Sequence, residues 1–481
     1  MAMTLTHTDD GFWTTASVIG RRTRGGSVRG LEREGVAVFR GLPFAAAPVG
    51  ELRFAAPRRC RVPHPDGFDA TRWGATPQRR DPGFDIPEPV VPGNDTLNVN
   101  VFAPVATLDA GAQHPVLVWI HGGGYRSGSA IGGWYDGRAF AQRGIVVVSI
   151  SYRLAVDGFV HIDGSPENRG VLDWIAALEW VQEFIADFGG DPGRVTIAGQ
   201  SAGGGAVLAL LATRRADGLF QRAWSLSGVL ESDPVDQARS RAMELAGMLG
   251  LPDCSAESFG AVADAVGQQV LATLAPFGPV VGEELFPSGI PAGLAQSRVP
   301  LVLGATADEM QWDAESPALS PDAVGELLAG AGVSSVDATQ FINGLGAGAE
   351  TSRQRVISEL WFRSTITEVL DRRESGRSFA YDYRWAPAAI GRSLHCNEIP
   401  VFFGVQDDPS VVRVLGNEIP EDVRALHDDA VRFIRGEDPK WLTGPVRASG
   451  FRVYGPPGDN FRLSSPLANR WQSPVNEEAD A

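Results

Sequence analysis

Cysteine and long apolar runs are both scarce in this sequence. The three cysteines, Cys60, Cys254 and Cys396, are far apart and odd in number, which excludes a small disulfide scaffold, and no C-x-x-C spacing suggests a metal site. No apolar run approaches the roughly 18 residues that span a bilayer. The first residues lack the basic and apolar regions of a secretory signal. We therefore expect a reduced, cytoplasmic protein with neither a metal nor a membrane partner.

Positive charge is also in short supply. The 42 basic residues are outnumbered by 58 acidic ones, and the net charge of −16 repels polyphosphate and anionic lipid, which argues against nucleic-acid binding. With 481 residues, 43% hydrophobic and 21% charged, the chain has a globular balance and can bury a large core. No internal repeat or low-complexity linker divides it. We expect a loose lead-in over residues 1–25 and a single domain over residues 26–481.

Apolar runs without alternation indicate parallel strands that are covered on both faces. Such runs occupy residues 116–120 and 145–151, and a helical period follows over 171–188. A strand at 195–198 leads into a small-residue helix that ends at Ala212. This alternation of strand and helix is typical of an α/β sheet. Further strands are expected at 301–303 and 379–383, with helical excursions near 233–296 and 315–375. A short apolar run at 36–39 is followed by an expected turn or loop at 41–43.

The strongest local motif is G-x-S-x-G, formed by residues 199–203 with Ser201 at its centre. A serine hydroxyl becomes a nucleophile only when a base takes its proton and its oxygen is exposed. A sharp turn from strand to helix exposes the oxygen, and small flanking residues allow the backbone to bend that tightly. Because a strand-like run precedes the motif and a small-residue helix follows, Ser201 is predicted to be a nucleophile rather than an ordinary serine in a glycine-rich turn.

A second motif, H-G-G-G-Y at residues 121–125, follows the strand expected at 116–120. Acyl transfer develops an oxyanion, and backbone N–H groups must already point at it. Consecutive glycines allow the backbone to turn such donors inward without Cβ clashes. The amide of Ala202, directly after the nucleophile, is expected to add another donor. A phosphate-binding loop is the competing interpretation, but the motif lacks the G-K-[ST] ending.

A serine nucleophile needs a base and an acid, in the chain order serine, acid, histidine for this type of sheet. Only His395 and His427 lie downstream of the serine. His427 lies in a charged helical stretch and is expected to be a solvated surface residue, which favours His395 as the base. Asp308 and Glu309 follow the strand at 301–303, where functional groups of α/β sheets gather. Position alone does not separate these two carboxylates.

Several ordered blocks of the chain resemble the type B carboxylesterase family, which includes bacterial para-nitrobenzyl esterases and animal cholinesterases. The blocks are VFRGLPFA, PVG, LRF, NRGVLD, ALEWV and FGGDP, at residues 38–45, 48–50, 52–54, 168–173, 177–181 and 188–192. The resemblance covers nearly the whole chain from about Gly26. It implies an α/β-hydrolase fold, with a large, mostly parallel twisted sheet flanked by helices and helical insertions that wall an active-site gorge.

The resemblance also assigns roles to individual residues, and it chooses one of the two neighbouring carboxylates. It implies Ser201 as nucleophile, His395 as base, Glu309 as acid, the amides of Gly123, Gly124 and Ala202 as the oxyanion hole, and Ser227 as support for the active-site hydrogen bonds.

The chain departs from the family pattern at several positions. Gln200 stands where the family usually has a glutamate, which removes a negative charge beside the nucleophile. Met310 replaces a glycine after the acid, and Trp174 replaces a common glutamine. The family's E-D-C-L segment reads N-D-T-L at residues 94–97, so the family's first disulfide cannot form. None of these changes removes a catalytic group.

The sequence therefore predicts two-step hydrolysis of a small-molecule ester through an acyl-enzyme, without cofactor or metal. Carbamate or amide hydrolysis by the same residues remains an alternative, and a non-catalytic adhesion-type relative is a remote one that the intact triad argues against. The oligomeric state is left unpredicted. Four aromatic side chains are the candidates for lining the substrate pocket: Trp134, Trp224, Phe402 and Phe403.

Overall fold

The computed structural model describes residues 11–60, 67–77, 86–108, 113–262, 266, 278–282, 284–312, 318–344, 351–373, 377–439, 452–456 and 467. Residues 1–10 of the expected lead-in and most of the stretch after residue 439 therefore lie outside the described residues, as do parts of both helical excursions.

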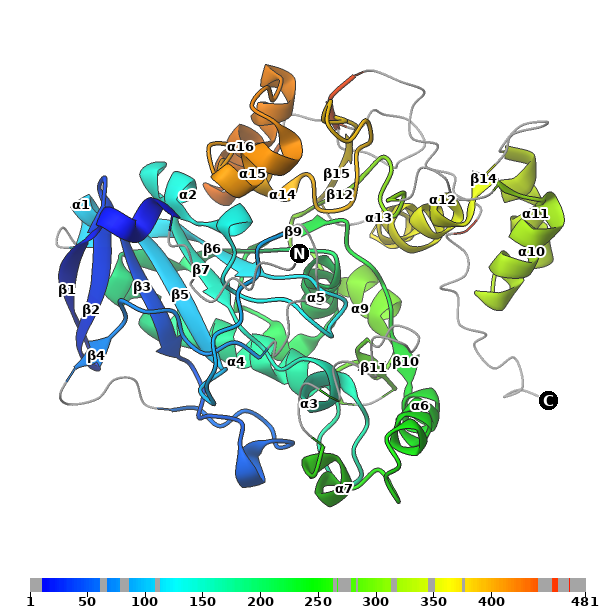
Figure 1. The fold of residues 1–481 in the computed structure, drawn as a ribbon, viewed down its shortest axis with the longest axis horizontal. Helices are drawn as coiled ribbons and strands as arrows, with labels where there is room; N and C mark the ends of the chain where they lie inside the picture. Colours follow the sequence, from blue (N-terminus) through cyan, green and yellow to red (C-terminus); the bar gives the residue numbers. More distant parts are fainter. Residues whose placement is uncertain are drawn as a thin grey trace, which may run out of the picture.

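Twelve of the described strands form one large mixed sheet (Figure 1). The strand order is β1-β2-β3-β5-β7-β6-β8-β9-β12-β15-β16, and β4 pairs with β2. Pairing is antiparallel from β1 to β7 and parallel from β7 to β16. The strands are β1 (Ser17–Thr23), β2 (Gly26–Arg33), β3 (Val36–Pro43), β4 (Phe68–Asp69), β5 (Asn98–Pro104), β6 (His114–Ile120), β7 (Val146–Ile150), β8 (Gly190–Gln200), β9 (Arg222–Leu226), β12 (Leu301–Thr306), β15 (Ser378–Tyr383) and β16 (Arg452–Tyr454).

Helices cover both faces of the sheet, as the apolar runs predicted. On β6, Val116 and Val118 face one core cluster, whereas Leu117 and Trp119 face the other. Figure 1 shows α4, α5 and α9 on the first face and α14 to α16 on the second. The helices are α1 (Val105–Leu108), α2 (Arg138–Gln142), α3 (Ala155–Phe159), α4 (Arg169–Phe184), α5 (Ala202–Ala212), α6 (Val235–Met248), α7 (Ala256–Gly260), α9 (Ile290–Gln296), α10 (Pro321–Gly330), α11 (Ser335–Gly344), α12 (Arg353–Ser358), α13 (Ser364–Arg372), α14 (Ile399–Phe403), α15 (Pro409–Leu415) and α16 (Glu421–Ile434).

Shorter elements complete the fold. Between α12 and α13 the helix widens into a π-helical turn, η6 (Glu359–Arg363). Two small sheets pair β10 (Asp233–Pro234) with β11 (Val280–Val281) and β13 (Ala318–Leu319) with β14 (Thr351–Ser352). The 3₁₀ turns are η1 (Gly11–Thr15), η2 (Gly50–Leu52), η3 (Gly133–Tyr135), η4 (Ile185–Phe188) and η5 (Arg214–Ala216).

Within the helical excursions, α9 and α13 pack against the sheet, whereas other helices lie outside the two layers that cover it. Figure 1 shows α6 and α7 beyond one end of the strands, and α10 and α11 at the far side of α12 and α13. The second excursion has a small core of its own, which includes Val324, Leu328 and Leu360. Among the described residues of these regions, helices occur together with the short strands β10, β11, β13 and β14.

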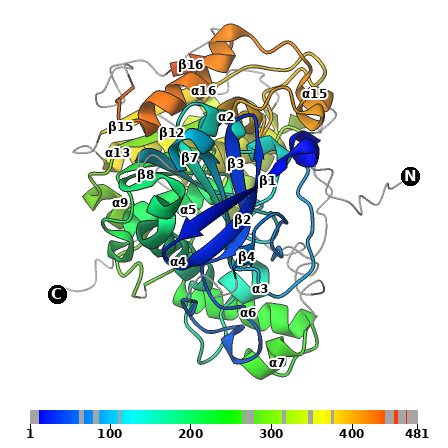
Figure 2. The ribbon, with the colours of Figure 1, turned by 90° about the vertical axis from the view of Figure 1, so that its left-hand side faces the viewer.

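The lead-in differs from the prediction of a loose segment. Residues Ser17–Thr23 form β1, which pairs along its whole length with β2 at the antiparallel edge of the sheet (Figure 2). Its sequence, SVIGRRT, holds only two neighbouring apolar side chains, Val18 and Ile19, so no apolar run marked it as a strand. Backbone pairing with β2 supplies the hydrogen bonds that composition alone did not predict.

His427 also differs from its prediction, because it is buried rather than solvated. It lies on the inner face of α16, with its ring centroid 4.6 Å from that of Phe140. Its Nδ1–H donates a hydrogen bond to the carbonyl oxygen of Phe402 at 2.8 Å. Burial lowers the pKa of His427 below its ordinary value. The charged neighbours that suggested a surface position lie on the other face of the same helix.

Candidate active site

Ser201 occupies the turn between β8 and α5. Its backbone has φ 57° and ψ −122°, a conformation that side-chain-bearing residues rarely adopt and that recurs at functional sites. Its two motif glycines are required by packing: a Cβ at Gly199 would lie 2.4 Å from the carbonyl oxygen of Gly203, and one at Gly203 would lie 2.0 Å from that of Ile120. The amide of Ser201 donates to the carbonyl of Leu226 at 2.9 Å, which ties the turn to β9.

The glycine loop after β6 lies against this turn. A Cβ at Gly122 would lie 3.1 Å from the Cβ of Ser201. Gly123 has φ 103°, and a Cβ there would meet the carbonyl oxygen of Ser127 at 2.2 Å, so only glycine fits. Within the described residues, the N–H groups of Gly123 and Gly124 have no hydrogen-bond acceptor. These two donors are therefore free to bind another acceptor.

The amide of Ala202 is a further donor in the same turn. Ala202 is the first residue of α5, and the first N–H groups of a helix have no acceptor within the helix. The positive end of the helix dipole also lies here, so a developing negative charge is favoured near Ser201.

Glu309 and His395 are joined directly. Nδ1 of His395 bonds to Oε2 of Glu309, and the backbone N–H of His395 donates to the carbonyl oxygen of Glu309 at 2.9 Å. The second carboxylate oxygen, Oε1, accepts from the amide of Thr306 at 2.8 Å. Asp308 instead accepts from the amide of Ser393 at 2.8 Å. The two neighbouring carboxylates thus point to different partners, and only Glu309 reaches the imidazole.

The imidazole of His395 is closely surrounded. Nε2 of Gln200 lies 3.2 Å from its Nε2 and 3.4 Å from its Nδ1, and the ring of Phe362 lies 4.8 Å away between centroids. Burial alone would lower the pKa of His395, but the adjacent sulfur of Cys396 and the carboxylate of Glu309 raise it well above its ordinary value. Within the described residues, no hydrogen bond yet joins His395 to the serine hydroxyl, and such bonds often tighten only with substrate.

A second buried carboxylate lies behind the imidazole. Ser227, at φ 44°, donates a hydrogen bond of 2.8 Å to Oε1 of Glu398, which is completely buried. Burial, together with the charge of Glu309, raises the pKa of Glu398 to about 7. Sequence reasoning missed Glu398. The available signal was a carboxylate directly before the apolar run at residues 399–403, three positions after His395.

The four aromatic residues expected to line the pocket lie in the core on the α14–α16 face. Trp224 packs edge-on against Phe402 at 5.4 Å between ring centroids, and Phe402 and Phe403 are both fully buried. Trp134 lies in the same cluster. This placement favours a role in core packing over contact with substrate.

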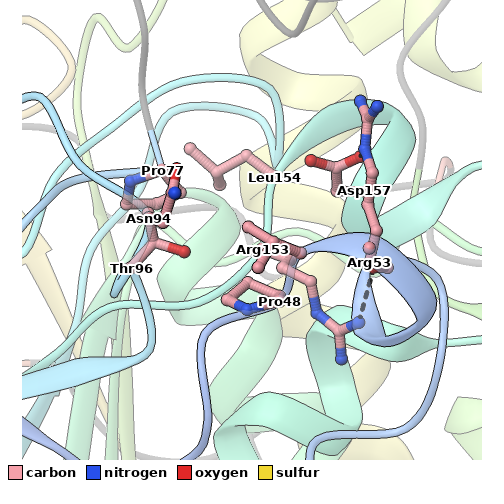
Figure 3. Close-up of a pocket in the computed structure, with 10 residues that line it drawn as sticks. Pro48, Arg53, Pro77, Asn94, Thr96, Arg153, Leu154 and Asp157 are labelled. Atoms are coloured by element: carbon pink, nitrogen blue, oxygen red, sulfur yellow. Dashed lines mark hydrogen bonds and ion pairs between the residues drawn. The ribbon is translucent and has the colours of Figure 1, made fainter. Parts of the chain in front are cut away.

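A polar cavity of about 290 Å³ lies between the loops that follow β3 and β7 and the segment that leads from β4 into β5 (Figure 3). Asn94 and Thr96, two of the positions that depart from the family pattern, contribute to its wall. Nε of Arg53 donates to Oδ1 of Asp157 at 3.0 Å on the opposite side. None of the three predicted catalytic side chains lines this cavity.

The described part of the chain offers neither a cluster of metal ligands nor a membrane-spanning helix. Among the residues that the structure describes, no group of three or more histidine, cysteine or acidic side chains could hold a metal ion. Across the same residues, no helix is both long and apolar enough to cross a bilayer. All three cysteines, which are all described, are unpaired thiols.

A mostly parallel sheet between helical layers, with a serine on a strained strand-to-helix turn, defines an α/β-hydrolase. A family model described as "Carboxylesterase family" matches residues 18–436, and the chain belongs to that family of carboxylic ester hydrolases. The fold class and the family predicted from the sequence are thereby confirmed.

Individual relatives agree with this assignment. The chain is 32% identical over 432 residues to para-nitrobenzyl esterase of Bacillus subtilis (strain 168), covering 84% of this chain and 86% of the relative. It is 31% identical over 480 residues to phenmedipham hydrolase of Pseudarthrobacter oxydans, covering 88% and 91%. A solved PNB esterase structure superimposes with a TM-score of 0.78 at 29% identity, covering 88% of this chain and 93% of that one.

Proposed function

We propose that the enzyme hydrolyses small-molecule esters through a Ser201–His395–Glu309 triad and an acyl-enzyme intermediate. The observation that carries the proposal is the direct bond between Glu309 and Nδ1 of His395 beside a strained serine turn. An acid on Nδ1 fixes the tautomer that leaves Nε2 free to accept a proton.

In this mechanism Ser201 attacks the ester carbonyl while Nε2 of His395 takes the hydroxyl proton. The amides of Gly123, Gly124 and Ala202 bind the oxyanion of the tetrahedral intermediate, which collapses as the imidazolium returns the proton to the leaving alcohol. Water, deprotonated by His395, then attacks the acyl-enzyme and releases the acid. Glu309 stabilises the imidazolium in both halves of the cycle.

Labelling with a fluorophosphonate probe tests the nucleophile. We expect one covalent adduct on Ser201, and none in Ser201→Ala, with loss of para-nitrophenyl acetate turnover by several orders of magnitude. An unlabelled but folded wild type would instead support the non-catalytic adhesion-type alternative. A crystal structure of the adduct tests the oxyanion hole: the phosphonyl oxygen must point at the amides of Gly123, Gly124 and Ala202.

Carbamate or amide hydrolysis by the same residues is the second candidate. Two relatives are named for para-nitrobenzyl esters and for phenmedipham, so both compounds belong in a turnover panel with esters of graded acyl length and matched anilides. We expect the highest kcat/KM among esters, because an amide leaves less readily. A higher kcat/KM for phenmedipham or an anilide would favour the second candidate.

We also retain the cytoplasmic location as a proposal. The three unpaired thiols support it, since a reducing compartment keeps such thiols free. A thiol titration under denaturing, non-reducing conditions should return three thiols per chain. A lower count that rises after reduction would contradict both the free thiols and the proposed location.

A further inference from the structure

The π-helical turn η6 brings an aromatic ring onto the catalytic histidine. It interrupts an otherwise continuous helical run between Arg353 and Arg372. A π-turn inserts one extra residue into a helix, which re-aims the side chains around it, and such turns are frequent at functional sites. Here the re-aimed side chain is Phe362, which is buried, with its ring centroid 4.8 Å from that of His395 at an interplanar angle of 50°.

Contacts at both ends of the turn fix it to the loop that carries Glu309. Before the turn, Oγ of Ser358 accepts a hydrogen bond of 3.1 Å from the amide of Met310, the residue after Glu309. At its end, Nη1 of Arg363 donates to the carbonyl oxygen of Thr306 at 3.5 Å. The amide of the same Thr306 binds the carboxylate of Glu309. The position of the phenyl ring is therefore coupled to the position of the acid.

We propose that Phe362 is a positioning residue for His395, an inference that rests on the proposed function. The imidazole has Glu309 on Nδ1 and the amide of Gln200 beside both ring nitrogens, and the phenyl ring packs against it as a third constraint. Packing there keeps the imidazole from rotating away from the serine. When His395 becomes an imidazolium during the reaction, the electron-rich ring also attracts the positive charge.

Leu360 provides a matched control within the same turn. Its side chain is 3% exposed, the same fraction as that of Phe362, but it packs into the separate small core with Val324 and Leu328. Truncating either residue opens a buried cavity in η6 and lowers stability. Only the truncation of Phe362 removes a contact with the imidazole.

The experiment compares Phe362→Ala, Phe362→Leu and Phe362→Tyr with Leu360→Ala. We expect Phe362→Ala to lower kcat by roughly 10–100-fold with little change in KM, because misplaced catalytic groups cost rate rather than ground-state binding. Leu360→Ala should keep kcat within about threefold of the wild type at temperatures below its unfolding transition. Phe362→Tyr should keep most of the activity, because its aromatic ring preserves the contact with the imidazole.

The pH–rate profile separates positioning from simple packing. Leucine at position 362 keeps the burial but loses the π face, so the imidazolium is less favoured and the apparent pKa of the rising limb should fall. Leu360→Ala should leave the apparent pKa of the rising limb unchanged. If Phe362→Leu retains the wild-type kcat and profile, or if Phe362→Ala and Leu360→Ala lose kcat equally, the inference is wrong even though the triad stands. Turnover that survives in Ser201→Ala would overturn the proposed function and this inference with it.

Discussion

The side-chain amide of Gln200 lies within 3.4 Å of both ring nitrogens of His395. A neutral side chain therefore occupies the place beside the base where the resembling family usually carries a glutamate. Because an opposite charge at this distance favours the protonated imidazole, a carboxylate at position 200 would favour the charged form of the base.

We predict that Gln200→Glu raises the apparent pKa of the rising limb in the kcat/KM profile. The new carboxylate stabilises the imidazolium, so a higher pH is needed to free the neutral base that accepts the serine proton. Profiles of the wild type and the variant with para-nitrophenyl acetate check the shift. Gln200→Met, which fills similar space without charge, serves as the control and should not raise the apparent pKa of the rising limb. An unchanged or lower apparent pKa in Gln200→Glu would count against an electrostatic link between position 200 and His395.

Neighbouring carboxylates provide the second prediction. Glu309→Gln should lower kcat on the order of 10⁴-fold, because a neutral amide no longer fixes the imidazole tautomer or stabilises the imidazolium. Asp308→Asn should keep most of the activity, since the Asp308 carboxylate binds the amide of Ser393 and the side chain of Gln311 and not the imidazole. Steady-state kinetics on both variants, with circular dichroism to show that they fold, decides between them. A crippled Asp308→Asn beside a near-normal Glu309→Gln would place the acid one residue earlier.

The parallel half of the sheet was predictable because its strands are buried on both faces. The apolar run at 116–120 corresponds to β6 (His114–Ile120), and that at 145–151 to β7 (Val146–Ile150). The order of serine, acid and histidine along the chain, together with the family resemblance, led to the residues that the structure brings near one another. These predictions depended on short motifs and on buried segments that are recognisable by their apolar composition.

Other features of the structure have no such signal in the local sequence. β1 is a polar edge strand whose structure comes from pairing with β2, not from an apolar period. Glu398 is buried by the tertiary packing of α14, although its residue type suggests the surface. The π-turn that holds Phe362 depends on contacts with a loop some 50 residues away, such as that between Ser358 and Met310. Each of these depends on partners that are distant in the sequence.

Backbone strain at the nucleophile provides the third prediction. Ser201 has φ 57° and ψ −122°, which glycine adopts readily and alanine does not. Both Ser201→Gly and Ser201→Ala remove the hydroxyl and should abolish turnover. We expect Ser201→Gly to be more stable than Ser201→Ala by about 1–2 kcal/mol, after allowing for the greater freedom of glycine in the unfolded chain. Urea unfolding of the two variants measures the difference, and an alanine variant of equal or greater stability would show that the turn is not strained.

The last prediction concerns the pH dependence of stability. Burial and the charge of Glu309 raise the pKa of Glu398 from 4.5 to about 7 in the folded protein. The folded state therefore binds this proton more tightly than the unfolded chain. Its contribution to the free energy of unfolding is complete below the unfolded pKa and is lost as the pH rises through about 7.

Glu398→Gln removes this titration while keeping an oxygen that can accept from Ser227. We expect the free energy of unfolding of the variant, relative to the wild type, to increase from pH 5 to pH 8 by on the order of 1–3 kcal/mol. Ser227→Ala gives the complementary test: its hydroxyl favours the charged carboxylate, so its loss should move the titration to still higher pH. Parallel stability curves for the wild type and Glu398→Gln across this range would mean that Glu398 titrates alike in both states, and that its burial is compensated by groups beyond Ser227.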